Sequence, residues 1–248
     1  MNNILQTYLT RTTETLQLVA EQNEAAFNAA GKLVANAYAA GKHIYVFGCT
    51  HSAILAEDVF FRAGAPAFWR PLWGPGMNIS NTPGFLSSAV ERNEELGNSI
   101  VACSQMGEGD VLVVLSTSAK NAAPVAVAAA ALKRGVKLII VASGNYRTQR
   151  GNHSRIANLW ELAPQAVMID NQVPCGDASI HVGDFGMGPV STMAGSFIMH
   201  AISAIAVADL NAMNITAPVF KSSNAPGGRE FNEKLLAEPE IRNAFLLP

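Results

Sequence analysis

The feature that most constrains the fold is a strand–helix–strand unit in the middle of the chain. Its sequence is DVLVVLSTSAKNAAPVAVAAAALKRGVKLIIVAS, residues 110–143. Two short apolar runs, 111–115 and 138–142, flank a helix of mostly Ala and Val that closes with Lys133, Arg134 and Gly135. That closing order is typical of a helix C-terminus. Strands joined by a helix of this length pair in parallel through a right-handed crossover, so the unit predicts a parallel sheet.

A second strand-to-helix junction occurs earlier in the chain. The apolar run HIYVF (43–47) predicts a buried strand and is followed by the polar turn GCTHS (48–52). AILAEDVFFRAG then predicts a helix ended by Gly64, and APAFWR is a second strand candidate. Two such junctions imply an open parallel sheet, and ligands of such sheets bind at the carboxyl ends of the strands.

Low charge suits a sheet that is covered on both faces. The chain of 248 residues is 49% hydrophobic and 15% charged, with abundant Ala, Val and Gly. We therefore predict an α/β fold, a three-layer αβα sandwich with an open, mainly parallel sheet of the flavodoxin-like or Rossmann-like kind. We expect one domain over residues 1–248, in which a helical segment (3–40) precedes a core (41–210) and a helical tail (211–248).

The other segments have simpler patterns. The stretch 71–85 is dense in Pro and Gly and predicts a loop. Glycines are expected to interrupt two helical segments, and two short apolar runs are strand candidates. These expectations are a helix break at Gly31, a second break near Gly97 within 86–106, and strands at ANLWEL (157–162) and AVMID (166–170).

Composition excludes several classes of protein. The net charge is −2 and the sequence has no block of Lys or Arg, so no basic surface for binding nucleic acid is predicted. Three cysteines without a CxxC pair indicate reduced thiols and a cytoplasmic protein, and the N-terminus shows no signal peptide. The apolar segment 186–210 contains several Ser and Thr and His200, and Lys or Arg do not flank it. We interpret it as a buried core helix and expect no membrane partner.

Polar groups at the first junction suit an anion. The turn contains Gly48, Thr50 and Ser52 directly before a predicted helix. Unpaired N–H groups and the helix dipole favour an anion at a helix N-terminus, and Ser52 can donate to a phosphate oxygen. Ser52 or Thr50 can equally serve only as an N-cap, so this junction alone leaves both roles open.

The second junction favours phosphate. Ser116, Thr117 and Ser118 place three hydroxyls in succession at a strand end, and Lys120 and Asn121 follow. One hydroxyl suffices for a cap, whereas several hydroxyls and amides satisfy the oxygens of a reversibly bound phosphate. A nucleotide is disfavoured because neither GxGxxG with a later acidic residue nor GxxxxGK[ST] is present. No cofactor is predicted.

These motifs also carry a family resemblance. The pieces VFGCTHSAILAEDVFFRAG, VLSTSAKNAAPVAVAAAALKRGVKLIIVAS, DNQVPCGDASI and GPVSTMAG resemble the SIS (sugar isomerase) domain family over roughly residues 30–210. The chain looks like a stand-alone, poorly characterised bacterial branch of it. The resemblance implies a phosphosugar site made of Ser52, Ser116, Thr117, Ser118 and Asn121, in a homodimer. Ala119 and Lys120 depart from the Gly and Arg of many members, which bears on the identity of the sugar.

Three residues are candidates for catalysis. Isomerisation of a phosphosugar moves a proton between carbons beside a carbonyl, which needs a base and a group acting on oxygen. Glu57 is the candidate base, because family members often carry a functional Glu here; the alternative is a solvated or ion-paired Glu. His51 is the candidate acid, or a turn histidine that contacts backbone. Asp177 is interpreted as a functional or interface carboxylate.

Two further histidines have competing interpretations. His181 and Asp184 in HVGD raise the question of a metal, but no second pair of ligands accompanies them, so no metal site is predicted. His200 fits a hydrogen-bonded core histidine, although some isomerases of the family use a histidine from this region.

The leading functional hypothesis is a phosphosugar isomerase that works through an enediol. A phosphosugar-binding sensor without turnover is the first alternative, because a fold does not establish catalysis. An etherase or lyase that begins with the same proton abstraction is the second. The sequence alone leaves the sugar open.

Overall fold

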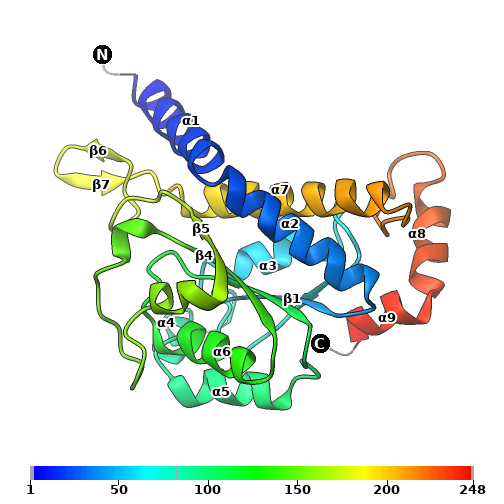
Figure 1. Cartoon of the computed structure of the whole chain (residues 1–248). Coiled ribbons are helices and arrows are strands. Elements are labelled where there is room, and N and C mark those ends of the chain that lie inside the picture. The colour runs from blue at the N-terminus through cyan, green and yellow to red at the C-terminus, as the bar shows by residue number, and fades with distance from the viewer. Residues whose placement is uncertain (1–2, 82, 247–248) are drawn as a thin grey trace.

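The computed structural model describes residues 3–81 and 83–246, and its centre is a five-stranded parallel sheet (Figure 1). The strand order is β2-β1-β3-β4-β5, and every neighbouring pair is parallel. An antiparallel hairpin, β6–β7, stands apart from this sheet. The strands are β1 (Ile44–Gly48), β2 (Trp69–Pro71), β3 (Val111–Leu115), β4 (Lys137–Ala142), β5 (Ala166–Asp170), β6 (Ile180–Val182) and β7 (Phe185–Met187).

Helices cover both faces of the sheet, which confirms the predicted α/β sandwich. The α-helices are α1 (Ile4–Gln22), α2 (Glu24–Ala39), α3 (Ala53–Val59), α4 (Leu86–Val90), α5 (Glu94–Cys103), α6 (Ala122–Lys133), α7 (Ser191–Ala212), α8 (Gly228–Ala237) and α9 (Pro239–Leu246). Two 3-10 helices, η1 (Gly144–Tyr146) and η2 (Leu159–Gln165), lie in connecting segments. That the whole chain forms one domain stays a prediction.

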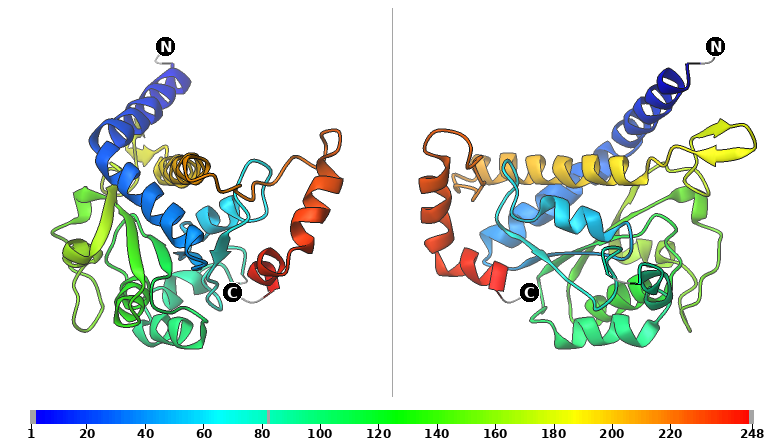
Figure 2. Two further views of the ribbon diagram at one scale, coloured as in Figure 1. Left: turned by 45° about the vertical axis from the view of Figure 1, so that its right-hand side comes forward. Right: turned by 180° about the vertical axis from the view of Figure 1, so that it is seen from behind.

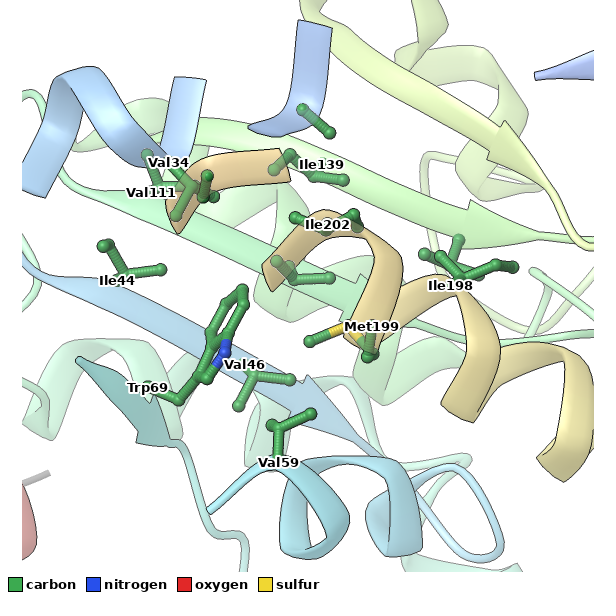
Figure 3. Close-up of a cluster of buried hydrophobic side chains, with 14 of the residues drawn as sticks. Val34, Ile44, Val46, Val59, Trp69, Val111, Ile139, Ile198, Met199 and Ile202 are labelled. Atoms are coloured by element: carbon green, nitrogen blue, oxygen red, sulfur yellow. The ribbon is translucent and has the colours of Figure 1, made fainter. Parts of the chain in front are cut away.

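The core divides into two layers because side chains alternate along each strand. On one face, α2, α3 and α7 pack against Ile44, Val46 and Trp69 and their neighbours (Figure 3). The Nε1–H of Trp69 donates to Ser203 Oγ on α7 at 3.0 Å. On the other face, α5 and α6 cover Tyr45 and the side chains beside it.

The apolar segment predicted as a core helix is α7. Among the described residues it is the one helix long and apolar enough to cross a membrane by length and composition. Here α7 lies across the sheet and packs along α2, with α3 beside it (Figure 2). Its inward residues, such as Ile198 and Ile202, are buried in the core.

The helix breaks predicted at glycines are wrong. The first division falls at Asn23, whose side chain donates to the carbonyl of Asp170 and accepts from its N–H. The second falls between Val90 and Glu94. Gly31 and Gly97 lie inside helices where another helix approaches: a Cβ on Gly31 would lie 2.3 Å from Ile205 Cγ2 of α7. These glycines mark close helix packing rather than helix ends.

Two other expectations need correction. The segment ANLWEL is not a strand, because η2 begins after Asn158, whose side chain caps the turn by accepting from the Trp160 N–H at 3.0 Å. Helix α3 ends at Val59, earlier than the expected Gly64. Strand AVMID is confirmed as β5.

Candidate functional site

A cavity of about 280 Å³ lies at the carboxyl ends of β1 and β3. It brings Ser52 of the first junction together with Ser116, Thr117 and Ser118 of the second, as expected of neighbouring parallel strands. Its lining residues are Cys49, Thr50, His51, Ser52, Glu91, Leu115, Ser116, Thr117, Ser118, Asn121, Pro124, Tyr146, Gly176, Asp177 and Ser191.

The first turn depends on close backbone packing. A Cβ on Gly48 would lie 2.3 Å from the carbonyl oxygen of Ser52, so only glycine lets the turn fold back on the strand. Thr50 adopts a positive φ of 53°, and its N–H donates to Met77 O at 2.7 Å. Ser52 precedes α3 without a side-chain capping bond. Its hydroxyl is therefore not occupied by the helix, whereas Gly48 shapes the turn and does not line the cavity.

The second turn directs polar groups into the same cavity. Thr117 Oγ1 accepts a hydrogen bond from Asn171 Nδ2 at 3.1 Å, which fixes this hydroxyl. Ala119 reverses the chain with a φ of 59°, a left-handed conformation that explains why glycine suits this position. Asn121 precedes α6 and makes no side-chain capping bond; its amide lines the cavity and forms a hydrogen bond with the side chain of Glu91.

Besides Gly48, two predicted site residues, Lys120 and Glu57, lie outside the cavity. The Nζ of Lys120 donates to Gln149 Oε1 at 2.6 Å and stands over the ring of Tyr146. Glu57 is exposed on α3, and its Oε1 accepts from Asn78 Nδ2 at 2.5 Å. Neither side chain lines the cavity of this chain.

His51 and Asp177 do line the cavity. Asp177 has a φ of 51°, and its Oδ1 accepts from the N–H groups of Val190 and Ser191 at 2.9 and 3.1 Å. The carboxylate thus satisfies backbone donors at the start of α7 and ties that helix to the cavity. His51 is exposed and lines the same cavity, and its side chain has no hydrogen bond to a described residue.

The carboxyl group that the sequence did not reveal is Glu91. Burial raises the pKa of Glu91, and the nearby Arg92, Asn121 and His51 counteract part of this rise. A raised pKa brings a carboxyl group closer to the range useful for proton transfer. Its position is fixed by tertiary structure, since its carbonyl accepts from the N–H of Ala123 on α6 at 2.9 Å. No sequence motif surrounds it.

Tyr146 and Ser191 also line the cavity, and neither was predicted as a site residue from the sequence. The Tyr146 hydroxyl accepts from the Gly176 N–H at 2.6 Å, which joins the loop after β4 to the segment that carries Asp177. Ser191 is the first residue of α7. No polar motif marked either residue: Tyr146 lies in the loop after β4, and Ser191 begins a helix that follows no strand of the sheet directly. Their approach to the cavity therefore follows from the tertiary fold.

The remaining candidates are placed elsewhere. His181 is exposed on β6, and Asp184 lies in the turn of the hairpin. His200 Nε2 lies 3.0 Å from Asp58 Oδ2, a contact between α7 and α3. The described residues include no group of three or more His, Cys, Asp or Glu that would hold a metal ion. Cys49 is buried, and its burial raises the pKa of the thiol, which disfavours a thiolate nucleophile.

The family is decided by comparison with known proteins. The SIS domain model matches residues 7–143, and a UPF0309 protein of Shouchella clausii is 31% identical over 89% of this chain and 90% of its own length. The chain belongs to the SIS domain family. A UPF0309 protein of Oceanobacillus iheyensis is 32% identical over 92% of the chain and 93% of its own length, and one of Streptomyces griseus is 34% identical over 90% of both.

Solved structures share the SIS fold at low identity. Phosphoheptose isomerase of Neisseria gonorrhoeae aligns with a TM-score of 0.51 at 14% identity, over 81% of this chain and 96% of its own. The Francisella tularensis phosphoheptose isomerase gives 0.51 at 16%, over 83% and 98%. The Vibrio vulnificus NanR protein complexed with ManNAc-6P gives 0.51 at 13%, over 100% and 71%. These likenesses establish the fold.

Proposed function

We propose that the chain is an enzyme that converts a phosphosugar by abstracting a proton beside the sugar carbonyl. The observation that carries this proposal is one cavity in which hydroxyls from two strand ends meet a partly buried carboxyl group, Glu91. The hydroxyls and amides suit the phosphate, and the carboxyl group suits the proton transfer.

The phosphate end of the substrate is assigned to the turn after β3. Ser116, Ser118 and Asn121 supply donors there, and Ser52 approaches from the neighbouring strand end. Among the described residues that line the cavity there is no Lys or Arg. Neutral donors bind a phosphate ester without a persistent ion pair, which suits a product that has to leave.

The proton transfer is assigned to Glu91 and His51. As a carboxylate, Glu91 takes a proton from the carbon beside the carbonyl, which produces an enediol after His51 protonates the carbonyl oxygen. Glu91 then returns the proton to the neighbouring carbon while His51 recovers one from the other oxygen, so no atom is gained or lost. This replaces Glu57 by Glu91 as first candidate for the base, because Glu57 does not line the cavity.

The test is a screen of aldose and ketose phosphates by thermal shift, followed by NMR of each hit in D₂O. An isomerase exchanges the carbon-bound proton for deuterium and forms a second sugar. Ser118→Ala is expected to raise KM, and Glu91→Gln to lower kcat by about 100-fold or more, with Glu57→Gln as the matched control. Wild-type turnover in Glu91→Gln would overturn the assignment.

Binding without turnover is the second candidate. The observation in its favour is the likeness of fold to NanR, which was solved with ManNAc-6P. In the same NMR experiment this function predicts a hit with neither deuterium exchange nor product. Loss of a substituent instead of isomerisation indicates the etherase or lyase reaction.

We also propose that the protein works in the cytoplasm as a homodimer or higher homo-oligomer. Support comes from exposed apolar side chains on neighbouring elements: Leu5 and Leu9 of α1 are 76% and 56% exposed, and Phe185 at the hairpin is 72% exposed. Exposed apolar groups of this kind accompany protein interfaces. Sedimentation velocity at micromolar concentration tests this, and a monomer there would contradict it.

A further inference from the structure

A second cavity lies at the opposite, amino-terminal edge of the sheet. It measures about 40 Å³ and is bounded by the start of β1, by β2 and by the C-terminal helix α9. Figure 2 shows α8 and α9 returning to this side of the molecule, away from the hairpin. The residues that line it are Tyr38, Lys42, His43, Ala67, Phe68, Arg70, Glu238, Glu240, Ile241 and Ala244. None of them lines the cavity at the carboxyl ends of β1 and β3, which is called the candidate active cavity below.

The notable residue of this cavity is Arg70. It is only 6% exposed, and its guanidinium makes no hydrogen bond or ion pair with a described residue. A guanidinium carries five N–H donors and remains charged, and burying such a group without an acceptor is very unfavourable. Burial also lowers the pKa of Arg70, with Tyr45, Glu240 and Asp110 opposing the effect. The Arg70 nitrogens are not among the fully buried atoms that lack a hydrogen bond, so the guanidinium presents its donors to the cavity, where a charged acceptor would pair with them.

A second buried group beside Arg70 lacks a partner. The hydroxyl of Tyr45 is inaccessible to solvent and has no hydrogen-bond partner among the described residues. Tyr45 and Arg70 are opposite each other in the β1–β2 register, so their side chains start from the same face of the sheet. Buried polar groups are nearly always satisfied in folded proteins. The unsatisfied Tyr45 hydroxyl does not itself line the cavity, but together with the unpaired Arg70 guanidinium it favours an acceptor on this side of the sheet.

The charges and the size of the cavity define the ligand. Lys42 adds a positive charge, although its Nζ also donates to Glu108 O at 2.9 Å. Burial and the charge of Arg70 lower the pKa of His43, so its ring serves as a neutral donor. Glu238 and Glu240 are exposed, and solvent screens their charges. The buried Asp110 is already engaged, because its oxygens accept from the N–H groups of His43 and Gly107. A volume of about 40 Å³ admits a group of only a few atoms.

We propose that this cavity binds a small oxyanion, a phosphate or a carboxylate, through the guanidinium of Arg70. The fork of Arg70 pairs with two oxygens of the anion, a geometry that ammonium groups do not offer. The bound anion joins β2 to α9, and it thereby fastens the C-terminal helices to the edge of the sheet. This site is independent of the proposed catalytic function.

The experiment measures thermal unfolding of the full chain in inorganic phosphate, with acetate as the carboxylate arm and chloride at equal ionic strength as the control. Because phosphate is also expected to bind the candidate active cavity, the reference protein is Ser118→Ala. At phosphate 100 times above its Kd, the unfolding constant of Ser118→Ala is expected to fall about 100-fold. Adding Arg70→Met is expected to abolish this change. A phosphate effect that persists in the double variant would overturn the proposal.

Two further measurements distinguish loss of anion binding from unfolding of the Arg70→Met variant. In buffer without oxyanions, Arg70→Met is expected to be at least as stable as the wild type, because it removes a buried charge that lacks a partner. Hydrogen–deuterium exchange of the wild type needs no variant: phosphate is expected to protect residues 66–72 and 238–244. Unchanged exchange in both segments at saturating phosphate would contradict the site.

Discussion

The substitution Gly48→Ala tests how the first turn builds the candidate active cavity. The added Cβ would lie 2.3 Å from the Ser52 carbonyl oxygen and 2.5 Å from its carbonyl carbon, both backbone atoms that no side-chain rotation can move. Ordinary contacts begin near 3.4 Å, so the backbone of residues 48–52 has to shift by about 1 Å. Overpacking of this kind costs about 1–3 kcal/mol of unfolding free energy.

The same shift displaces Ser52 and His51 from the cavity. A misplacement of about 1 Å typically lowers turnover by about 100-fold, so we expect kcat/KM for the phosphosugar substrate to fall by that order. The assays are urea denaturation and the NMR turnover measurement. Gly107→Ala is the matched control, because its Cβ would meet no atom within 4 Å and its φ is not positive. If Gly48→Ala matched Gly107→Ala in both stability and turnover, the close approach would not shape the site.

The remaining predictions concern the proton-transfer group, a helix cap and the core. Burial raises the pKa of Glu91, and its ionised form is the base, so kcat/KM is expected to rise with pH through a pKa above 4.5. A pH–rate profile measures this rise. If Glu91→Gln showed the same fall of kcat/KM toward acid pH, the assignment would be refuted. Asp177→Ala removes the acceptor of two N–H groups at α7, and urea denaturation is expected to show a loss of about 0.5–2 kcal/mol; an unchanged midpoint would contradict the capping role. Ser203→Ala leaves the buried Trp69 Nε1–H without its acceptor and is expected to cost about 1–3 kcal/mol in the same assay, whereas wild-type stability would show that the bond contributes nothing.

Local patterns predicted the sheet because its strands are buried on both faces. Such strands appear as continuous apolar runs, and Val111–Leu115 and Lys137–Ala142 were identified on that basis. The helix ends predicted at Gly31 and Gly97 were wrong, because these glycines permit close approach of another helix. Nothing in the local sequence distinguishes that role from a helix stop. Asn23 ends α1 through bonds to Asp170, a partner far along the chain.

The candidate site likewise contains residues that the sequence predicted and residues that it did not. Its phosphate-facing groups, Ser52 and Ser116–Ser118, follow strand ends and were therefore visible in the sequence. Glu91 was not visible, because it lies at the end of a short helix and reaches the cavity only through packing against α6. Tertiary contacts bring it there, and they were not encoded by any local spacing.

The cavity at the ends of β1 and β3 is proposed to hold the phosphate of a phosphosugar. The most direct measurement is a crystal structure with a bound phosphosugar from the screen. We expect phosphate oxygens within hydrogen-bonding distance of the Ser116 and Ser118 hydroxyls, with the carbonyl end of the sugar toward Glu91. Phosphate bound elsewhere, with these hydroxyls turned away from the ligand, would contradict it.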